Sequence, residues 1–115
     1  MHELSIVLSL LDEIGDETSA RGLEKVEIVH LKVGVFSGVD PAALLFAWGM
    51  ACEGTPFAQA KLAIETVPLV VFCAVCGQPG LPPSLYQICC PVCGTPSATI
   101  VSGRELELVS LELAA

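Results

Sequence analysis

The sequence predicts an α+β fold in which a small mixed β-sheet and two helices are interrupted by a cysteine-rich insert. Apolar residues recur at helical spacing near the N-terminus, and a second apolar stretch carries a helix start signal. Three other segments are rich in β-branched residues or alternate polar with apolar ones, as strands do. We expect residues 1–69 and 99–115 to form one domain and residues 70–98 to form a second one.

The first helix is expected from about residue 4 to the high teens. Its predicted buried stripe consists of Leu4, Val7, Leu8, Leu11 and Ile14. The acidic residues Asp12, Glu13, Asp16 and Glu17 then fall on the outward side. The role of this helix is mainly core packing.

A second helix is expected from Asp40 to about Cys52. Asp40 supplies an N-cap acid, and Pro41 follows at the first helical position, where its missing N–H costs nothing. Strands are expected at residues 25–35, 60–67 and 104–113, and the loop Phe36-Ser37-Gly38 ends the first of them.

Composition narrows the classes of function. The chain has a formal net charge of −8, with five Lys and Arg against thirteen Asp and Glu, so it lacks the basic patch of a nucleic-acid binder. No apolar run reaches the roughly 18 residues that a membrane span needs, and we expect a cytoplasmic protein with no membrane partner. Hydrophobic residues make up 53% of the chain, which favours an apolar surface for a protein partner. One assembly compatible with this composition is a homodimer.

The insert carries two C-x-x-C-G motifs, Cys73 to Gly77 and Cys90 to Gly94, and thirteen residues separate Cys76 from Cys90. This is the sequence form of a zinc ribbon or rubredoxin-like site, because two intervening residues let both sulfurs of one turn reach the same ion at about 2.3 Å. Four thiolates fill a tetrahedral shell, so the zinc would stabilise the fold and leave no position for catalysis.

The other cysteines are expected to lie outside this site. Cys89 is a neighbour of Cys90 without the matching spacing, and Cys52 fits a small core residue in an apolar helix. The alternative for the C-x-x-C pairs is thioredoxin-type redox chemistry, which would leave one pair free of metal and reactive.

The first three residues offer a second metal site. The α-amine of Met1, the amide nitrogen of residue 2 and the δ nitrogen of His2 can form fused chelate rings, and such nitrogen-rich planar sets suit Ni(II) or Cu(II). Glu3 adds an amide nitrogen or a carboxylate, or simply an acid favourable at a helix start. His30 lies in a predicted strand and fits a structural or surface residue.

Several segments, in order, resemble the HypA/HybF family over nearly the whole chain. They are Met1-His2-Glu3 before a helix, the stretch Leu31 to Pro41 (LKVGVFSGVDP), the apolar helix after it, the two C-x-x-C motifs and the closing Gly103 to Leu108 (GRELEL). The resemblance implies a nickel-binding domain and a separate zinc domain that help insert Ni(II) into the large subunit of [NiFe]-hydrogenase. It also implies a partner GTPase, HypB, and no catalytic activity of its own.

The resemblance places the nickel ligands at His2, Met1 and Glu3, with Asp40 as a further candidate. For Asp40, the sequence supports a helix cap and a ligand about equally. The zinc ligands are expected at Cys73, Cys76, Cys90 and Cys93. The competing interpretation is a zinc-ribbon module that recruits another macromolecule and has no nickel function. Which hydrogenase, or a urease instead, would receive the nickel is left open.

Overall fold

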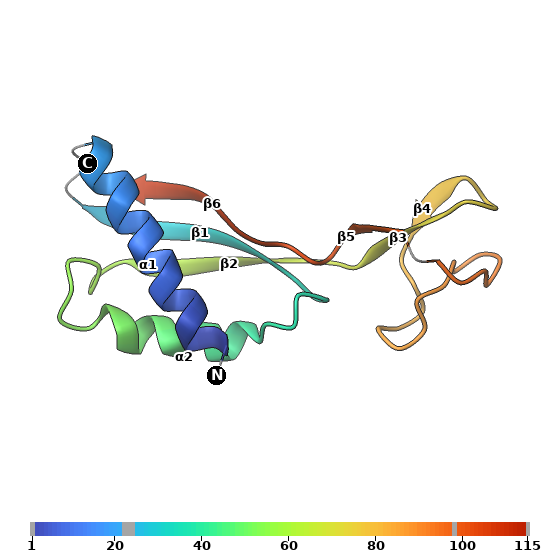
Figure 1. The fold of residues 1–115 in the computed structure, drawn as a ribbon, viewed down its shortest axis with the longest axis horizontal. Helices are drawn as coiled ribbons and strands as arrows, with labels where there is room; N and C mark the ends of the chain where they lie inside the picture. The colour runs from blue at the N-terminus through green and yellow to red at the C-terminus, as the bar shows by residue number, and fades with distance from the viewer. Residues whose placement is uncertain (1, 22–24, 98, 115) are drawn as a thin grey trace. The chain divides into compact units, whose positions relative to one another are not determined.

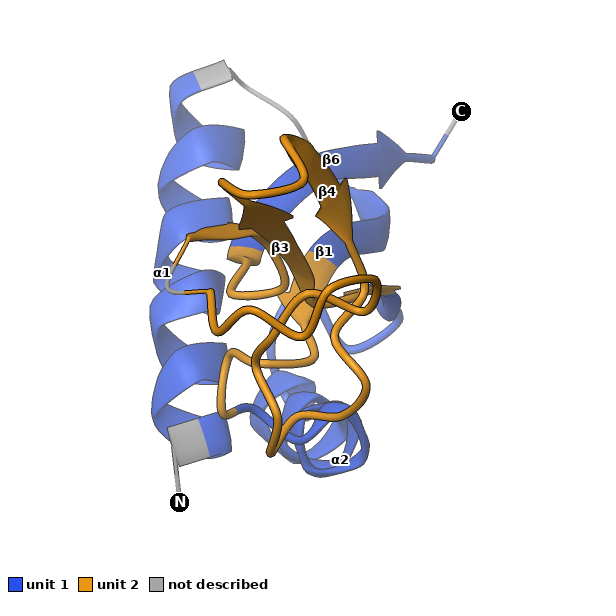
Figure 2. Cartoon of the chain, turned by 90° about the vertical axis from the view of Figure 1, so that its right-hand side faces the viewer, with its two compact units in different colours: residues 1–31, 39–65, 107–115 blue, residues 32–38, 66–106 orange. Residues whose placement is uncertain are grey.

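The computed structural model describes residues 2–21, 25–97 and 99–114 and divides into two compact units (Figures 1 and 2). The first unit contains residues 1–31, 39–65 and 107–115, and the second contains residues 32–38 and 66–106. The elements, in chain order, are α1 (His2–Arg21), β1 (Val26–Gly34), α2 (Pro41–Cys52), β2 (Lys61–Val67), β3 (Val70–Cys73), β4 (Gln78–Gly80), β5 (Ile100–Ser102) and β6 (Leu106–Leu113). The predicted α+β class, with two helices and small mixed sheets, is therefore confirmed.

A three-stranded sheet has the strand order β2-β1-β6. The Val35 N–H donates to the Val67 carbonyl at 2.9 Å, where both strands end, so β1 and β2 run parallel. At the ends of β6, the Ala114 N–H donates to the Lys25 carbonyl and the Gly34 N–H to the Glu105 carbonyl, so β6 is antiparallel to β1. The parallel pair is joined by the crossover helix α2, as Figure 1 shows.

The core of the first unit lies between the two helices and the strands. Val29 of β1, Ile14 of α1 and Leu44 of α2 are fully buried. Trp48, the single tryptophan, is also buried, and its indole N–H donates to the Ala60 carbonyl at 3.1 Å. This bond satisfies the one polar atom of the ring, as a buried indole requires.

The buried stripe of α1 differs in part from the prediction. Val7 and Ile14 are buried as expected, but Leu4 and Leu8 are exposed. Leu10 and Thr18 are buried in their place, so the buried face of α1 is formed by Val7, Leu10, Ile14 and Thr18. A threonine can lie there because its hydroxyl donates to the Ile14 carbonyl at 2.9 Å, one turn back.

The second unit contains a sheet of its own, with strand order β4-β3-β5. Both neighbours pair antiparallel with β3, and the register shifts between Val70 and Val71 where β3 meets β5. These three short strands were not expected from the sequence. The domain boundaries expected at residues 70 and 98 stay a prediction.

Three backbone segments of the second unit meet closely at Gly34, Leu69 and Gly103. A Cβ atom added to Gly34 would lie 2.0 Å from the Gly103 carbonyl oxygen, and one added to Gly103 would lie 2.7 Å from Leu69 Cα. Gly103 also has a φ of +115°, which residues with a side chain rarely adopt. The Phe36 N–H donates to the Gly103 carbonyl at 2.7 Å, which fixes the segment that follows β1.

Among the described helices, none has the length and apolar character needed to cross a membrane.

Candidate metal centres

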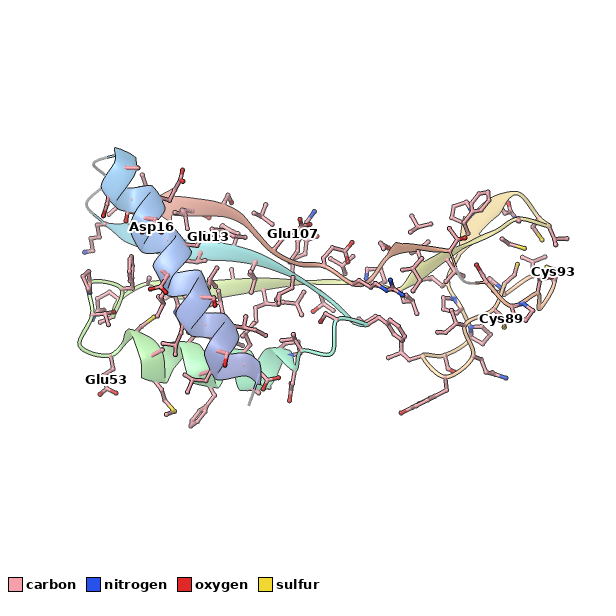
Figure 3. The ribbon with its side chains drawn as sticks, in the orientation of Figure 1. Glu13, Asp16, Glu53, Cys89, Cys93 and Glu107 are labelled. Carbon is pink, nitrogen blue, oxygen red and sulfur yellow. The ribbon has the colours of Figure 1, made fainter. Side chains whose placement is uncertain are left out.

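The four predicted zinc ligands converge in the second unit. The sulfur atoms of Cys73, Cys76, Cys90 and Cys93 all lie within 4.8 Å of one another. Cys73 ends strand β3, and the others come from the two cysteine turns, one of which carries Cys93 in Figure 3. The Cys73 and Cys90 side chains are buried, Cys76 is partly buried and Cys93 is exposed.

The two cysteine turns repeat the same local structure. In the first, the Gly77 N–H donates to the Cys73 carbonyl at 2.7 Å and the Cys76 N–H points to the Cys73 sulfur at 3.3 Å. In the second, the Gly94 N–H donates to the Cys90 carbonyl at 3.0 Å. Gly77 and Gly94 have φ values of +70° and +77°, so each turn closes through the left-handed conformation that glycine supplies.

The sulfur separations match a tetrahedral thiolate site. Sγ of Cys73 lies 3.6 Å from Sγ of Cys93, and Sγ of Cys90 lies 3.8 Å from Sγ of Cys76. Four sulfurs at about 2.3 Å from one ion would stand roughly 3.8 Å apart. A disulfide would need about 2.05 Å, and these cysteines are free. The donor set therefore fits a metal such as zinc.

Hydrogen bonds to Cys90 and Cys93 favour the thiolate forms of these two side chains. The Thr95 hydroxyl and backbone N–H lower the pKa of Cys93 to about 6, and the hydroxyl lies 3.1 Å from Sγ. The backbone N–H groups of Cys93 and Val92 lower the pKa of Cys90. The neighbouring sulfurs, Cys93 first, raise the pKa of Cys76 to about 12. Four thiolates so close together repel one another, and a divalent cation removes this conflict.

The second candidate metal site lies where the N-terminal ends of α1 and α2 come together. Glu3 lies in the first turn of α1, and its Oε2 accepts a hydrogen bond from the Asp40 N–H at 3.4 Å. The Asp40 side chain accepts from the Ala42 N–H at 3.0 Å, which confirms that Asp40 caps α2. Two of the predicted nickel ligands, 37 positions apart, thus lie side by side. Met1 and the side chain of His2 lie outside the described residues.

Charge at this point favours a cation. Hydrogen bonds from its own backbone amide, and to a lesser extent from the Asp40 N–H, keep the pKa of Glu3 below its ordinary value of 4.5. Glu3 is therefore ionised at neutral pH. An N-terminal segment with a carboxylate next to Asp40 can supply oxygen donors to a metal held by nitrogen ligands.

The remaining cysteines and the second histidine lie apart from these groups. Cys52 is buried in α2, and this burial raises the pKa of its thiol. Cys89 precedes the second cysteine turn, and its backbone pairs with that of Pro96 in an isolated antiparallel β-bridge. It does not belong to the four-sulfur cluster (Figure 3). His30 Nε2 lies 2.5 Å from Glu112 Oε2, so it ties β1 to β6. Thr95 was not expected at the site from the sequence, and its place two residues after Cys93 is the one signal that points to it.

Comparison with known proteins agrees with these features. The family model described as "Hydrogenase/urease nickel incorporation, metallochaperone, hypA" matches residues 1–113. Hydrogenase maturation factor HypA of Chloroflexus aggregans is 43% identical over 112 residues, covering 97% of this chain and 98% of that protein. Its counterpart in Chloroflexus aurantiacus is 45% identical over 114 residues, with coverages of 97% and 98%.

Solved structures give the same result. The solution structure of the Ni metallochaperone HypA from Helicobacter pylori aligns with a TM-score of 0.68 and 26% identity, covering 98% of this chain and 97% of that one. A further HypA solution structure aligns with a TM-score of 0.72 and 27% identity. The expected resemblance and the expected lack of catalytic activity are thereby confirmed. The chain belongs to the HypA family of hydrogenase and urease nickel-incorporation metallochaperones, which are maturation factors rather than enzymes.

Proposed function

We propose that this protein binds Ni(II) at its N-terminus and helps to insert it into the large subunit of a [NiFe]-hydrogenase. The observation that carries the proposal is the hydrogen bond from the Asp40 backbone N–H to the Glu3 carboxylate, because it joins the first turn of α1 to the residue that caps α2. The α-amine of Met1, the residue 2 amide and the His2 imidazole would complete a nitrogen-rich donor set. Such a terminal chelate suits delivery, since it can hold an ion and still hand it to a receiving site.

The four cysteines are proposed to hold one structural zinc ion. Cys73, Cys76, Cys90 and Cys93 provide four sulfurs at tetrahedral separations, and the short strands β3 and β4 bury little apolar surface that could hold the turns together. A bound zinc would contribute folding free energy there. Residues 70–98 then serve as the zinc domain, and residues 1–69 with 99–115 serve as the nickel domain.

Nickel affinity should depend on pH through the nitrogen donors. The amine and imidazole bind only when deprotonated, so affinity should weaken as the pH falls below about 6 to 7. Glu3 does not produce this loss, because its lowered pKa keeps the carboxylate ionised well below that range.

The proposed partners follow from the family. They are the GTPase HypB and the hydrogenase large subunit, met in the cytoplasm, with no role for nucleic acid or membrane. The net charge of −8 is consistent with the absence of nucleic acid from this set.

The test is a nickel titration of tag-free protein, with zinc measured by elemental analysis in the same samples. The chain has two histidines, so His30→Ala is a matched control for His2→Ala. We expect one zinc per chain in all three proteins and nickel binding that is lost only in His2→Ala. Nickel binding that survives in His2→Ala would refute the terminal chelate and favour a zinc-ribbon interaction module. An N-terminal tag should abolish nickel binding as His2→Ala does.

A further inference from the structure

The four sulfurs of the cysteine cluster are held in different ways. Cys73 and Cys90, the first cysteines of the two turns, are buried. The Cys73 sulfur accepts the Cys76 N–H at 3.3 Å, and the Cys90 sulfur accepts the Val92 N–H at 3.4 Å. Cys93 is the exposed member of the cluster. Because solvent and reagents reach an exposed sulfur first, the contacts of Cys93 determine how firmly the site is closed.

Thr95 makes a contact of another kind with Cys93. The Thr95 Oγ1 atom lies 3.1 Å from the Cys93 Sγ atom. A thiolate bound to zinc carries no proton, so in the loaded site the hydroxyl is the donor of this hydrogen bond. A hydrogen bond to an anionic acceptor is roughly twice as strong as one between neutral groups. The hydroxyl therefore stabilises Cys93 in the anionic form that zinc requires.

The backbone around Thr95 holds this hydroxyl in place. The Thr95 carbonyl accepts from the Cys90 N–H at 2.9 Å, and the next residue, Pro96, pairs with Cys89 through its backbone. A residue that precedes proline is restricted to extended conformations, and a β-branched side chain has few rotamers. Both restrictions apply to Thr95. Its hydroxyl is therefore oriented before a metal binds.

The first cysteine turn provides an internal comparison. In the second turn, Thr95 lies two residues after Cys93. The corresponding residue of the first turn is Gln78, which pairs with Cys73 between β3 and β4 and is exposed. A glutamine has no hydroxyl, and the first turn nevertheless closes through the same kind of glycine. The turn itself therefore does not need a hydroxyl at this position, and the Thr95 hydroxyl has a role beyond closing it.

We propose that Thr95 is a positioning residue for zinc, whose hydroxyl holds the exposed Cys93 sulfur in the coordination shell. The inference rests on the zinc site proposed above. Groups that hydrogen-bond to metal ligands typically contribute about 10- to 100-fold to metal affinity. Without the hydroxyl, the Cys93 thiolate carries more electron density and is open to solvent. Zinc is then released more easily from the Cys93 side, although the same four cysteines bind it.

The test compares Thr95→Val with Thr95→Ser in tag-free protein. Valine keeps the shape of the side chain and removes the hydroxyl, whereas serine keeps the hydroxyl. Thr99→Val is the matched control, because it makes the same substitution four positions further along the chain, outside the cysteine turns. Elemental analysis gives the zinc content, and competition with a chromophoric chelator gives the zinc affinity. We expect one zinc per chain in the wild type and all three variants, and an affinity about tenfold lower only in Thr95→Val.

Two further measurements report on the Cys93 sulfur itself. In protein loaded with Co(II), the sulfur-to-metal charge-transfer band should move to lower energy in Thr95→Val, because a hydrogen bond stabilises the sulfur lone pairs. The band should return to its original position in Thr95→Ser. Alkylation of Cys93 by iodoacetamide in the zinc-loaded protein, located by mass spectrometry, should be roughly threefold faster in Thr95→Val.

An unchanged zinc affinity or an unmoved charge-transfer band in Thr95→Val would overturn the inference. So would an equal loss of affinity in Thr95→Ser or in Thr99→Val, because the effect would then not come from the Thr95 hydroxyl. A wild-type chain without stoichiometric zinc would overturn the zinc assignment as well, whereas the other results leave that assignment intact.

Discussion

Asp40 combines two roles that a pair of substitutions can separate. Asparagine caps a helix as well as aspartate does, because its side-chain oxygen can still accept from the backbone, but it has no carboxylate charge. Alanine removes both functions. Comparing Asp40→Asn with Asp40→Ala therefore isolates the contribution of the charge to nickel binding from that of the cap to the stability of α2.

The structure gives the expected magnitudes. The Asp40 carboxylate accepts from the Ala42 N–H at 3.0 Å, and the Asp40 backbone has an extended φ of −87° and ψ of 115°, as a cap requires. Losing this bond in Asp40→Ala should cost about 1 kcal/mol, or roughly 4 °C in the unfolding midpoint. Asp40→Asn should keep nearly all of this stability. If the carboxylate also binds nickel beside Glu3, both variants should lose about tenfold in nickel affinity.

Trp48 makes the stability assay specific. It is the only tryptophan, it is buried in α2, and it bonds to the Ala60 carbonyl, so its fluorescence reports unfolding of the first unit. Calorimetric titration of the same samples gives the nickel affinity. If Asp40→Asn destabilises as much as Asp40→Ala, the capping argument is wrong. If Asp40→Asn binds nickel as tightly as wild type, Asp40 is a cap and not a ligand.

Three other predictions follow from buried and crowded positions. Ile14→Ala should lose about 3 kcal/mol of folding free energy, whereas Leu8→Ala should lose less than about 0.5 kcal/mol. Denaturant titration monitored by Trp48 fluorescence distinguishes the two variants. Equal losses would mean that Leu8 is buried, as the sequence predicts. Gly34→Ala should destabilise by roughly 3 kcal/mol, because its Cβ would overlap the Gly103 carbonyl, and a soluble variant with an unchanged midpoint would contradict that contact. Cys90→Ser should abolish stoichiometric zinc in elemental analysis, whereas Cys89→Ser should retain it; loss of zinc in both would place Cys89 in the site.

Local signals in the sequence were sufficient to predict the two helices and three longer strands α1, α2, β1, β2 and β6. The Asp40-Pro41 pair determines where α2 begins through a bond that spans two residues, and such local chemistry can be recognised without a structure. The cysteine spacing was equally informative, because each C-x-x-C-G turn closes on itself and needs only its own glycine.

The features that the sequence did not reveal depend on contacts between distant segments. Strand β3 is four residues long and β4 and β5 are three, so none shows a readable alternation. Which side of α1 is buried depends on what packs against it. Helical periodicity alone does not show that Leu10 is buried and Leu8 is exposed. The contact between Glu3 and Asp40 joins positions 37 residues apart, which only the fold brings together.

The crowded crossing of Gly34, Leu69 and Gly103 lies close along the chain to the first of the four clustered cysteines. Cys73 follows Leu69 by four residues. Four residues span at most about 14 Å even when fully extended. The segment that carries Cys73 therefore starts from a point in the second unit where the backbone leaves no room for a methyl group on Gly34 or Gly103.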